Sequence, residues 1–117
     1  MIHILKYKLA PQHEQVLQFA GAVLPLHVAV DNGDAYLWAQ VNDAAGPRGH
    51  RVHIYATGDD VVMADEPTAM YVGTYRLAEG RKMWHVYLDY KVVAVPAADP
   101  GDEEGLVLVN EKATTEL

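Results

Sequence analysis

The sequence predicts an all-β domain, a compact and mainly antiparallel sandwich or open barrel. Three observations support this class: short runs of β-branched and aromatic residues alternate with polar ones, turn residues separate these runs, and an Asn-Gly pair joins two of them. The chain has 117 residues, half of them hydrophobic, which suffices for one domain with a single core. We therefore expect a single β domain over residues 1–95.

The N-terminal part is expected to contain three strands. Residues 3–9 alternate in polarity, and Pro11 ends this run because proline cannot donate to the strand ladder. Residues 14–19 are predicted to form a second strand, with a short helix as the alternative. Residues 23–30 form the third, with Pro25 near its beginning, where proline is best tolerated.

The strongest local signal is Asn32-Gly33, between two apolar runs. This pair suits the two positive-φ positions of a type I′ turn, so residues 24–30 should pair antiparallel with residues 35–41. The second arm alternates between a small apolar face and a large face that can form hydrogen bonds, the latter made of Tyr36, Trp38 and Gln40.

Three further strands are predicted at residues 51–57, 70–77 and 83–89, with a loop at residues 42–50 and an irregular connection at residues 58–68. In the first of these strands the outward side chains are those of Arg51, His53, Tyr55 and Thr57. In the last, Trp84, Val86 and Leu88 face the core, whereas the opposite face carries His85 and Tyr87.

The composition changes after residue 95. Residues 96–117 are rich in acid, proline and glycine, which predicts a tail outside the core, with a possible edge strand at residues 106–109. Residues 91–95 could extend the preceding strand.

Charge and cysteine content exclude several classes of protein. The net charge is −7, with 16 acidic and 9 basic residues, which argues against a nucleic-acid binder that relies on phosphate contacts. The chain has no cysteine, which rules out a disulfide framework and fits a reducing cytoplasm. It also has no signal-peptide pattern at its start and no apolar run long enough for a membrane span, so we expect a cytoplasmic protein that does not enter membranes.

Seven short motifs, in their order and spacing, resemble a family of small phage-encoded proteins of unknown function. The resemblance spans roughly residues 2 to 89. The motifs are Lys6-Tyr7-Lys8-Leu9, Asn32-Gly33, Leu37-Trp38-Ala39, Arg51-Val52-His53-Ile54, Thr57-Gly58, Tyr71-Val72-Gly73-Thr74 and Trp84-His85-Val86. The chain departs from the family after Thr57-Gly58, where Asp59-Asp60 replaces a histidine and a proline.

The resemblance implies a genetic setting, the cytoplasm of a phage-infected host cell. Small accessory phage proteins often act by binding something of the host, and several unrelated families sequester nucleotide-derived immune signals in counter-defence, such as cyclic dinucleotides or cyclic ADP-ribose isomers. The leading prediction is therefore a binding protein that sequesters such a signal without chemistry and without a cofactor.

The predicted ligand site assumes that the outward faces of three strands line one concavity. Aromatic rings there would stack on a base, Arg51 would hold a phosphate, and histidines and hydroxyls would orient a ribose. The alternative is an ordinary half-buried sheet face, because these residue types are common in strands. The predicted ligand-binding residues are Tyr36, Trp38, Gln40, Arg51, His53, Tyr55, Thr57, His85 and Tyr87.

Other functions are weaker predictions. The three-residue spacing of His50 and His53 sends their rings to opposite faces of a strand, so no metal site is expected. The chain lacks serine and cysteine, which excludes Ser-His and Cys-His pairs and leaves no assigned catalytic residue. A small phosphodiesterase remains the enzymatic alternative, because His53-Ile54-Tyr55 and His85-Val86-Tyr87 repeat a His-x-hydroxyl spacing.

A third alternative is a protein–protein inhibitor or structural accessory whose aromatic face is an interface. Exposed strand edges and large aromatic faces also favour a homo-oligomer.

Overall fold

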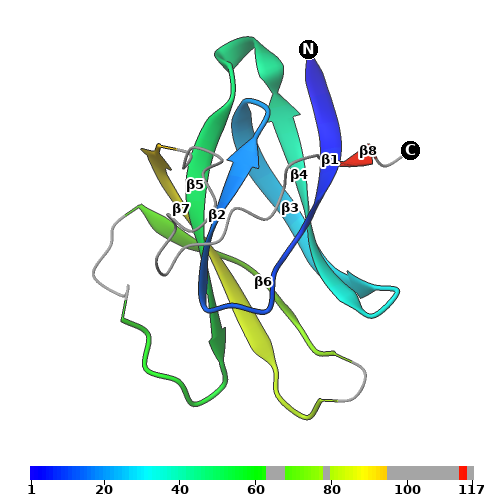
Figure 1. The fold of residues 1–117 in the computed structure, drawn as a ribbon, viewed down its shortest axis with the longest axis vertical. Helices are drawn as coiled ribbons and strands as arrows, with labels where there is room; N and C mark the ends of the chain where they lie inside the picture. Colours follow the sequence, from blue (N-terminus) through cyan, green and yellow to red (C-terminus); the bar gives the residue numbers. More distant parts are fainter. Residues whose placement is uncertain (63–67, 78–79, 95–113, 116–117) are drawn as a thin grey trace, which may run out of the picture.

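The computed structural model describes residues 1–62, 68–77, 80–94 and 114–115, and these residues form two antiparallel sheets packed face to face (Figure 1). The sheets do not close into a barrel, so the predicted all-β class is confirmed in its sandwich form. Within the described ranges, the only helical element is a single 3₁₀ turn, η1 (Asp43–Ala45).

Each sheet combines strands from distant parts of the sequence. The first sheet has the order β3-β4-β1-β8, with β1 (Ile2–Lys8), β3 (Ala22–Asp31), β4 (Asp34–Asn42) and the two-residue β8 (Thr114–Thr115). The second sheet has the order β2-β5-β7-β6, with β2 (Glu14–Phe19), β5 (Arg48–Ala56), β6 (Ala69–Tyr75) and β7 (Trp84–Val93).

The core lies between the sheets and follows the period of two that the sequence shows. Alternate side chains of β1, β4, β5 and β7 are buried there, while their neighbours point outward. The cluster contains Leu5, Tyr7, Leu9, Leu17, Phe19, Val28, Ala35, Leu37, Ala39, Val41, Val52, Ile54, Tyr75, Val86 and Leu88.

The hairpin between β3 and β4 forms where the Asn-Gly pair predicts it. Asn32 has φ of 51° and Gly33 has φ of 83°, and Asp31 pairs with Asp34 across the turn. Both positions thus adopt the left-handed conformation that a type I′ turn needs. The predicted pairing of residues 24–30 with residues 35–41 is confirmed.

The β1–β2 connection transfers the chain from the first sheet to the second. The fully buried Gln15 fixes it: its Oε1 accepts from the Ala10 N–H at 2.9 Å, and its Nε2 donates to the carbonyls of Ala10 at 3.0 Å and Gln12 at 3.3 Å. The side-chain amide thus satisfies backbone groups that no strand partner reaches. Pro11 and Gln12 are held in one geometry as a result.

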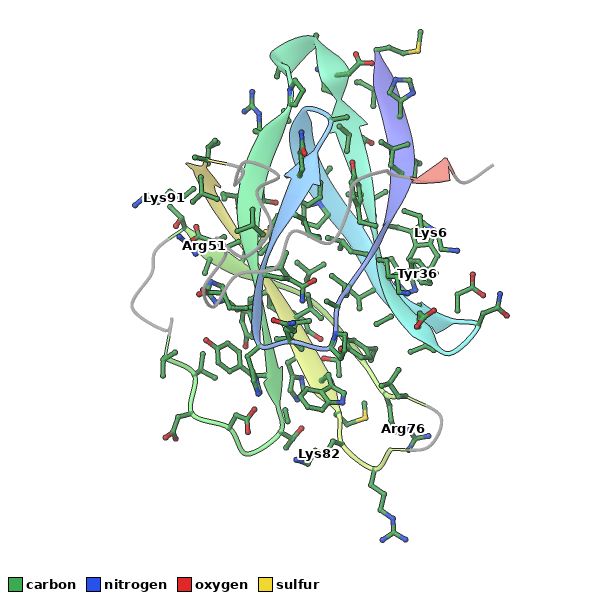
Figure 2. The ribbon with its side chains drawn as sticks, viewed as in Figure 1. Lys6, Tyr36, Arg51, Arg76, Lys82 and Lys91 are labelled. Atoms are coloured by element: carbon green, nitrogen blue, oxygen red, sulfur yellow. The ribbon has the colours of Figure 1, made fainter. Side chains whose placement is uncertain are left out.

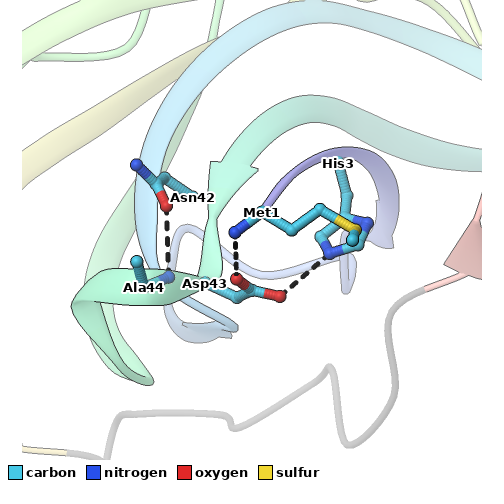
Figure 3. Close-up of polar contacts among 5 residues, drawn as sticks. All are labelled: Met1, His3, Asn42, Asp43 and Ala44. Atoms are coloured by element: carbon cyan, nitrogen blue, oxygen red, sulfur yellow. Dashed lines mark hydrogen bonds and ion pairs between the residues drawn. The ribbon is translucent and has the colours of Figure 1, made fainter.

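A second group of side-chain hydrogen bonds holds the chain where β4 ends. Asn42 caps η1 by accepting the Ala44 N–H at 3.1 Å, and Asp43 contacts both the α-amino group of Met1 at 2.8 Å and His3 Nε2 at 2.9 Å (Figure 3). Both hydrogen bonds lower the pKa of the Asp43 carboxyl, and the one from the amino group has the larger effect. The start of β1 is thereby tied to the end of its partner strand.

Close packing beside this turn requires glycine at position 21. A Cβ built there would lie 1.9 Å from the carbonyl oxygen of Asn42, well inside van der Waals contact. Because the obstruction is backbone, a neighbouring side chain cannot relieve it by changing rotamer.

The strand boundaries differ from the sequence prediction most clearly in β5, and β6 ends at Tyr75 instead of at residue 77. β5 begins at Arg48, inside the expected loop 42–50, because Arg48 and Gly49 pair with Phe19 and Gln18 of β2. Pairing with neighbouring strands here overrides the turn propensity of Gly and Pro. β5 also ends at Ala56, which leaves Thr57 just beyond the strand.

Other predicted elements agree or lie beyond the described residues. Residues 14–19 are a strand and not the alternative helix, and β7 continues from Trp84 to Val93 through a register shift opposite β5. The expected edge strand at residues 106–109, like most of the tail 96–117, lies outside the described residues. Thr114–Thr115 pairs with Leu5 and Lys6 of β1.

We predict that Gln15→Leu destabilises the domain by roughly 1–3 kcal/mol, because it removes three part-buried hydrogen bonds to the backbone of the β1–β2 connection. Urea unfolding followed by circular dichroism measures the change. Gln12→Ala is the matched control, since it removes an exposed side chain but keeps the backbone carbonyl that Gln15 uses. Equal losses in the two variants would contradict this role of the Gln15 amide.

Candidate functional site

The outer face of the second sheet carries a cluster of tyrosine rings from three adjacent strands. Tyr55 of β5 and Tyr87 of β7 meet edge to face with centroids 6.1 Å apart, and Tyr87 meets Tyr71 of β6 at 5.7 Å. Strand alternation places these rings outside, because Ile54, Val86 and their inward neighbours fill the core. We call this surface the tyrosine face.

A carboxylate and two basic side chains border the tyrosine face. Glu14, the first residue of β2, lies opposite His53 in the strand register. Its Oε1 is 3.6 Å from His53 Nδ1, and its Oε2 is 3.5 Å from Arg51 Nη1. The His53 ring in turn stacks on Tyr55, with an interplanar angle of 10°. Sequence reasoning expected the outward direction of Arg51 and His53, and the structure agrees.

His85 is held by hydroxyl groups on both sides. Its Nε2 is 2.8 Å from Thr57 Oγ1 and its Nδ1 is 3.0 Å from Thr74 Oγ1, while Tyr71 Oη is 2.5 Å from the same Thr74 oxygen. A neutral imidazole donates from one nitrogen and accepts at the other. Both nitrogens of His85 are therefore engaged, one threonine donating to the ring and the other accepting from it.

Two adjoining hollows open beside the tyrosine face. One, of about 360 Å³, is lined by His13, Glu14, His53, Tyr55, Asp59, Asp60 and Val62. The other, of about 320 Å³, is lined by Glu14, Arg51, His53, Val62, Asp89, Lys91 and Val93. They share Glu14, His53 and Val62 and so lie side by side, and we call the two hollows together the groove. Each hollow alone reaches the lower part of the size range of small-molecule sites, about 300–1,000 Å³.

One end of the groove is acidic, and the other, which we call the mixed end, carries both basic and acidic side chains. Asp59 and Asp60 lie at the acidic end, where Asp59 also accepts the Ala56 N–H at 2.8 Å. Arg51 and Lys91 lie at the other end, together with Asp89 (Figure 2). A ligand that carries both hydroxyl groups and a negative charge matches this distribution.

Asp89 is buried at the mixed end and remains ionised. Burial raises the pKa of the Asp89 carboxyl. This effect is outweighed by hydrogen bonds from the Thr68 hydroxyl at 2.5 Å and the Lys91 N–H at 2.9 Å, together with the nearby side chains of His53 and Lys91, so the pKa is lowered. The carboxylate thus anchors Thr68, the last residue of the β5–β6 connection, against β7.

The predicted site is divided between two surfaces. Tyr36, Trp38 and Gln40 lie on β4 of the first sheet and point away from the core, whereas the six other predicted residues lie on or beside β5 and β7 of the second sheet. The assumption that three outward strand faces line one concavity is therefore wrong. The sequence does not reveal that β4 and β5 belong to opposite sheets. The six residues that the structure brings together are Arg51, His53, Tyr55, Thr57, His85 and Tyr87.

The outer face of the first sheet has its own aromatic cluster. Lys6 Nζ lies 4.2 Å from the centroid of the Tyr36 ring and 5.5 Å from that of Trp38, and it also pairs with Asp31 at 2.8 Å (Figure 2). His27 of β3 adds a ring 5.8 Å from Trp38. Large exposed apolar side chains continue this face, namely Ile2, Ile4, Leu24 and Leu26.

Several residues of the groove were absent from the sequence prediction. Glu14 and His13 come from β2 and its approach, and only the β2–β5 pairing places them beside His53. Tyr71 could have been found by extending the alternation rule to the strand after residue 69, since it lies directly opposite Tyr87. The acidic pair Asp59-Asp60 lies in the connection that the sequence predicts to be irregular.

His50 lies beneath the site with its ring in the core, while His53 faces outward, as their spacing predicts. Its Nδ1 donates to the Asp89 carbonyl at 3.0 Å, and its ring meets Phe19 edge-on. Burial lowers the pKa of His50, against the opposing effect of the Asp89 carbonyl. No group of three or more His, Cys, Asp or Glu residues in the described part of the chain is placed to hold a metal ion.

The fold and this groove define the chain as an all-β sandwich domain with a polar, aromatic face. A model of a domain family of unknown function, DUF7352, matches residues 1–95, and the chain belongs to this family. No curated protein and no solved structure matches the chain significantly. Among the described residues no helix is both long and apolar enough to cross a membrane.

We predict that acid destabilises the domain partly through His50. Because the folded-state pKa of His50 is lower than its ordinary value of 6.5, the unfolded chain binds this proton first, and stability falls as the pH drops below 6.5. One such proton contributes a slope of at most about 1.4 kcal/mol per pH unit.

Urea unfolding between pH 7.5 and 5 checks this prediction, with His50→Asn as the comparison because an amide can still donate to the Asp89 carbonyl. The variant should lose less stability over this interval than the natural protein. Parallel pH profiles would show that His50 is not responsible.

Proposed function

We propose that this domain binds a small nucleotide-type ligand in the groove beside the tyrosine face and sequesters it without chemistry. The observation that carries the proposal is the convergence of aromatic rings, a guanidinium and carboxylates on one groove built from the three adjacent strands β2, β5 and β7 and the turn after β5. Such a combination of flat apolar surfaces with a few polar groups is typical of small-molecule sites.

Each part of a nucleotide has a matching region in the groove. The base lies against the parts of Tyr55 and His53 that line the first hollow. The phosphate lies toward Arg51 and Lys91, and the ribose hydroxyls donate to Asp60 at the acidic end. This arrangement assigns opposite ends of the ligand to opposite ends of the groove.

The contacts of His85 favour binding over catalysis. A general base needs a free nitrogen lone pair, and both nitrogens of His85 are engaged by Thr57 and Thr74. His53 is within 3.6 Å of Glu14 and could act as an alternative base, so the phosphodiesterase alternative remains testable. One observation favours it: His53 lies opposite Tyr87, and Tyr55 lies opposite His85, in the register of β5 and β7.

The proposed setting is that of a phage accessory protein acting in the cytoplasm of a host cell. The resemblance of the ordered motifs to small phage-encoded proteins supports this setting. The ligand would then be an immune signal such as a cyclic dinucleotide or a cyclic ADP-ribose isomer. Binding without turnover would lower the free concentration of that signal.

A second candidate function is a protein interface on the first sheet. Trp38 and Tyr36 lie there beside the exposed side chains of Ile4 and Leu24, and exposed apolar clusters of this kind commonly mark contact surfaces. Pairing of two copies through this face would make the homo-oligomer that we predict. Sedimentation at increasing concentration, compared with Leu24→Glu, distinguishes a dimer from a monomer.

We predict that cyclic dinucleotides or cyclic ADP-ribose isomers raise the thermal unfolding temperature of the protein, because a ligand that binds only the folded state stabilises it. Tyr55→Leu should weaken the affinity about 5- to 150-fold, the effect of losing one stacking ring. Calorimetry at a temperature where both proteins are folded measures this change.

Tyr36→Leu is the matched control, because it removes a tyrosine from the opposite sheet, and it should leave the affinity unchanged. Ligand recovered intact after heating the complex excludes the phosphodiesterase. No thermal shift with any member of the panel would refute the proposed function.

We also predict that Glu14→Gln strengthens the binding of a phosphorylated ligand, by roughly threefold to tenfold. Glu14 competes with the ligand for Arg51, and its charge repels a phosphate at short range. The affinity of the matching unphosphorylated nucleoside should not change. Asp34→Asn, which removes the same charge from the first sheet, serves as the control, and an equal gain there would contradict a local effect of Glu14.

A further inference from the structure

A separate cavity opens at the end of the sandwich where β6 and β7 are joined. It measures about 190 Å³ and is lined by Pro11, Gln12, His13, Ile54, Tyr75, Leu77 and Trp84. Its walls come from two chain segments, the β1–β2 connection and the ends of β6 and β7, and Ile54 of β5 forms the floor. It shares only His13 with the groove of the tyrosine face.

The size and walls of this cavity fit one aromatic ring. An apolar protein cavity of about 150 Å³ is known to hold benzene. Three of the lining side chains are themselves rings, those of His13, Tyr75 and Trp84, and Tyr75 lies directly opposite Trp84 in the strand register. Because Gln15 holds Pro11 and Gln12 in place, the cavity exists before any ligand enters.

The contact of His13, which lines the cavity, with the Ile54 carbonyl determines its tautomer. Its Nδ1 lies 3.1 Å from the carbonyl oxygen of Ile54, which can only accept, so the proton is on Nδ1 and neutral His13 carries a lone pair on Nε2. The backbone carbonyl of His13 also accepts the Ile54 N–H at 2.8 Å, which fixes the residue against β5.

Lys82 places a positive charge beside the cavity. Lys82 Nζ lies 6.0 Å from the centroid of the Trp84 ring, and Arg76 and Lys82 extend from the same end of the molecule (Figure 2). Three of the nine basic residues of this acidic chain fall within residues 76–82, and none of the three forms an ion pair in the described part of the structure. No lining residue of the cavity is acidic.

We propose that this cavity binds the aromatic ring of a small anion, such as an aryl carboxylate, with the ring between Trp84 and Tyr75 and the charge toward Lys82. The ring gains apolar burial and aromatic contacts, and the exposed cations attract the negative group. This site is independent of the proposed function, because it lies on the core side of β6 and β7 and not on the tyrosine face.

Nuclear magnetic resonance of the two tryptophan indole N–H groups tests the proposal on the whole protein. Trp38→Phe removes one of the two signals and so assigns the other to Trp84. The probes are 3-phenylpropionate and 2-phenylethylamine, which carry the same ring but opposite charges. At low salt we expect 3-phenylpropionate to shift the Trp84 signal saturably at millimolar concentration, to leave the Trp38 signal in place, and to bind more tightly than the amine.

Charge variants separate attraction at the mouth from burial of the ring. Arg81→Glu combined with Lys82→Glu should weaken 3-phenylpropionate binding by about tenfold, and Lys82→Gln alone by about twofold to fivefold. Lys8→Glu combined with Lys91→Glu changes the net charge equally, but at residues that do not line the cavity, and it should have no such effect.

Equal shifts of both indole signals, equal affinities for the two probes, or a shift that does not saturate would each overturn the proposal. An equal loss of affinity in the two double variants would likewise show that the overall charge, and not the cavity mouth, attracts the anion.

Discussion

The hydrogen bonds of the buried Gln15 amide determine how the two sheets are joined. One side chain satisfies three backbone groups of the β1–β2 connection, so the chain leaves the first sheet and enters the second along a single path. Glu14 and His13, next to it, are thereby placed beside β5, where Glu14 meets Arg51 and His53. Both the groove and the apolar cavity depend on this path, since His13 borders each of them.

β5 is the strand on which both surfaces are built, and it is buried on its two faces. Val52 and Ile54 point into the core, while His53 and Tyr55 on the outer side are also less than a tenth exposed. The Tyr87 ring meets Tyr55 on this side, and Asp59, Asp60 and Val62 line the hollow beside it. A strand enclosed in this way cannot rearrange without loss of packing on both sides, so the groove is rigid where Tyr55 and His53 form it.

The local features of the fold could be predicted from the sequence, whereas the assembly of the site could not. The period-two alternation correctly assigned the core sides of β4, β5 and β7, and Asn32-Gly33 correctly located a hairpin. These features depend on neighbours along the chain. The division of the aromatic residues between two sheets depends on strand order, and the burial of Gln15 depends on contacts that no periodicity records. At the start of β5, pairing with β2 outweighs the tendency of the local residues to form a turn, so the strand begins earlier than predicted.

The edge strands β3 and β6, which pack against each other at one side of the sandwich, are both irregular. β3 contains Pro25 and a register shift after it, and β6 contains a shift between Tyr71 and Gly73. Such interruptions prevent an edge from serving as a template for strands of other molecules. Under the proposed function, the protein would bind one ligand per site without turnover and would have to accumulate to the abundance of its target. Irregular edges would let it reach that concentration without forming fibres.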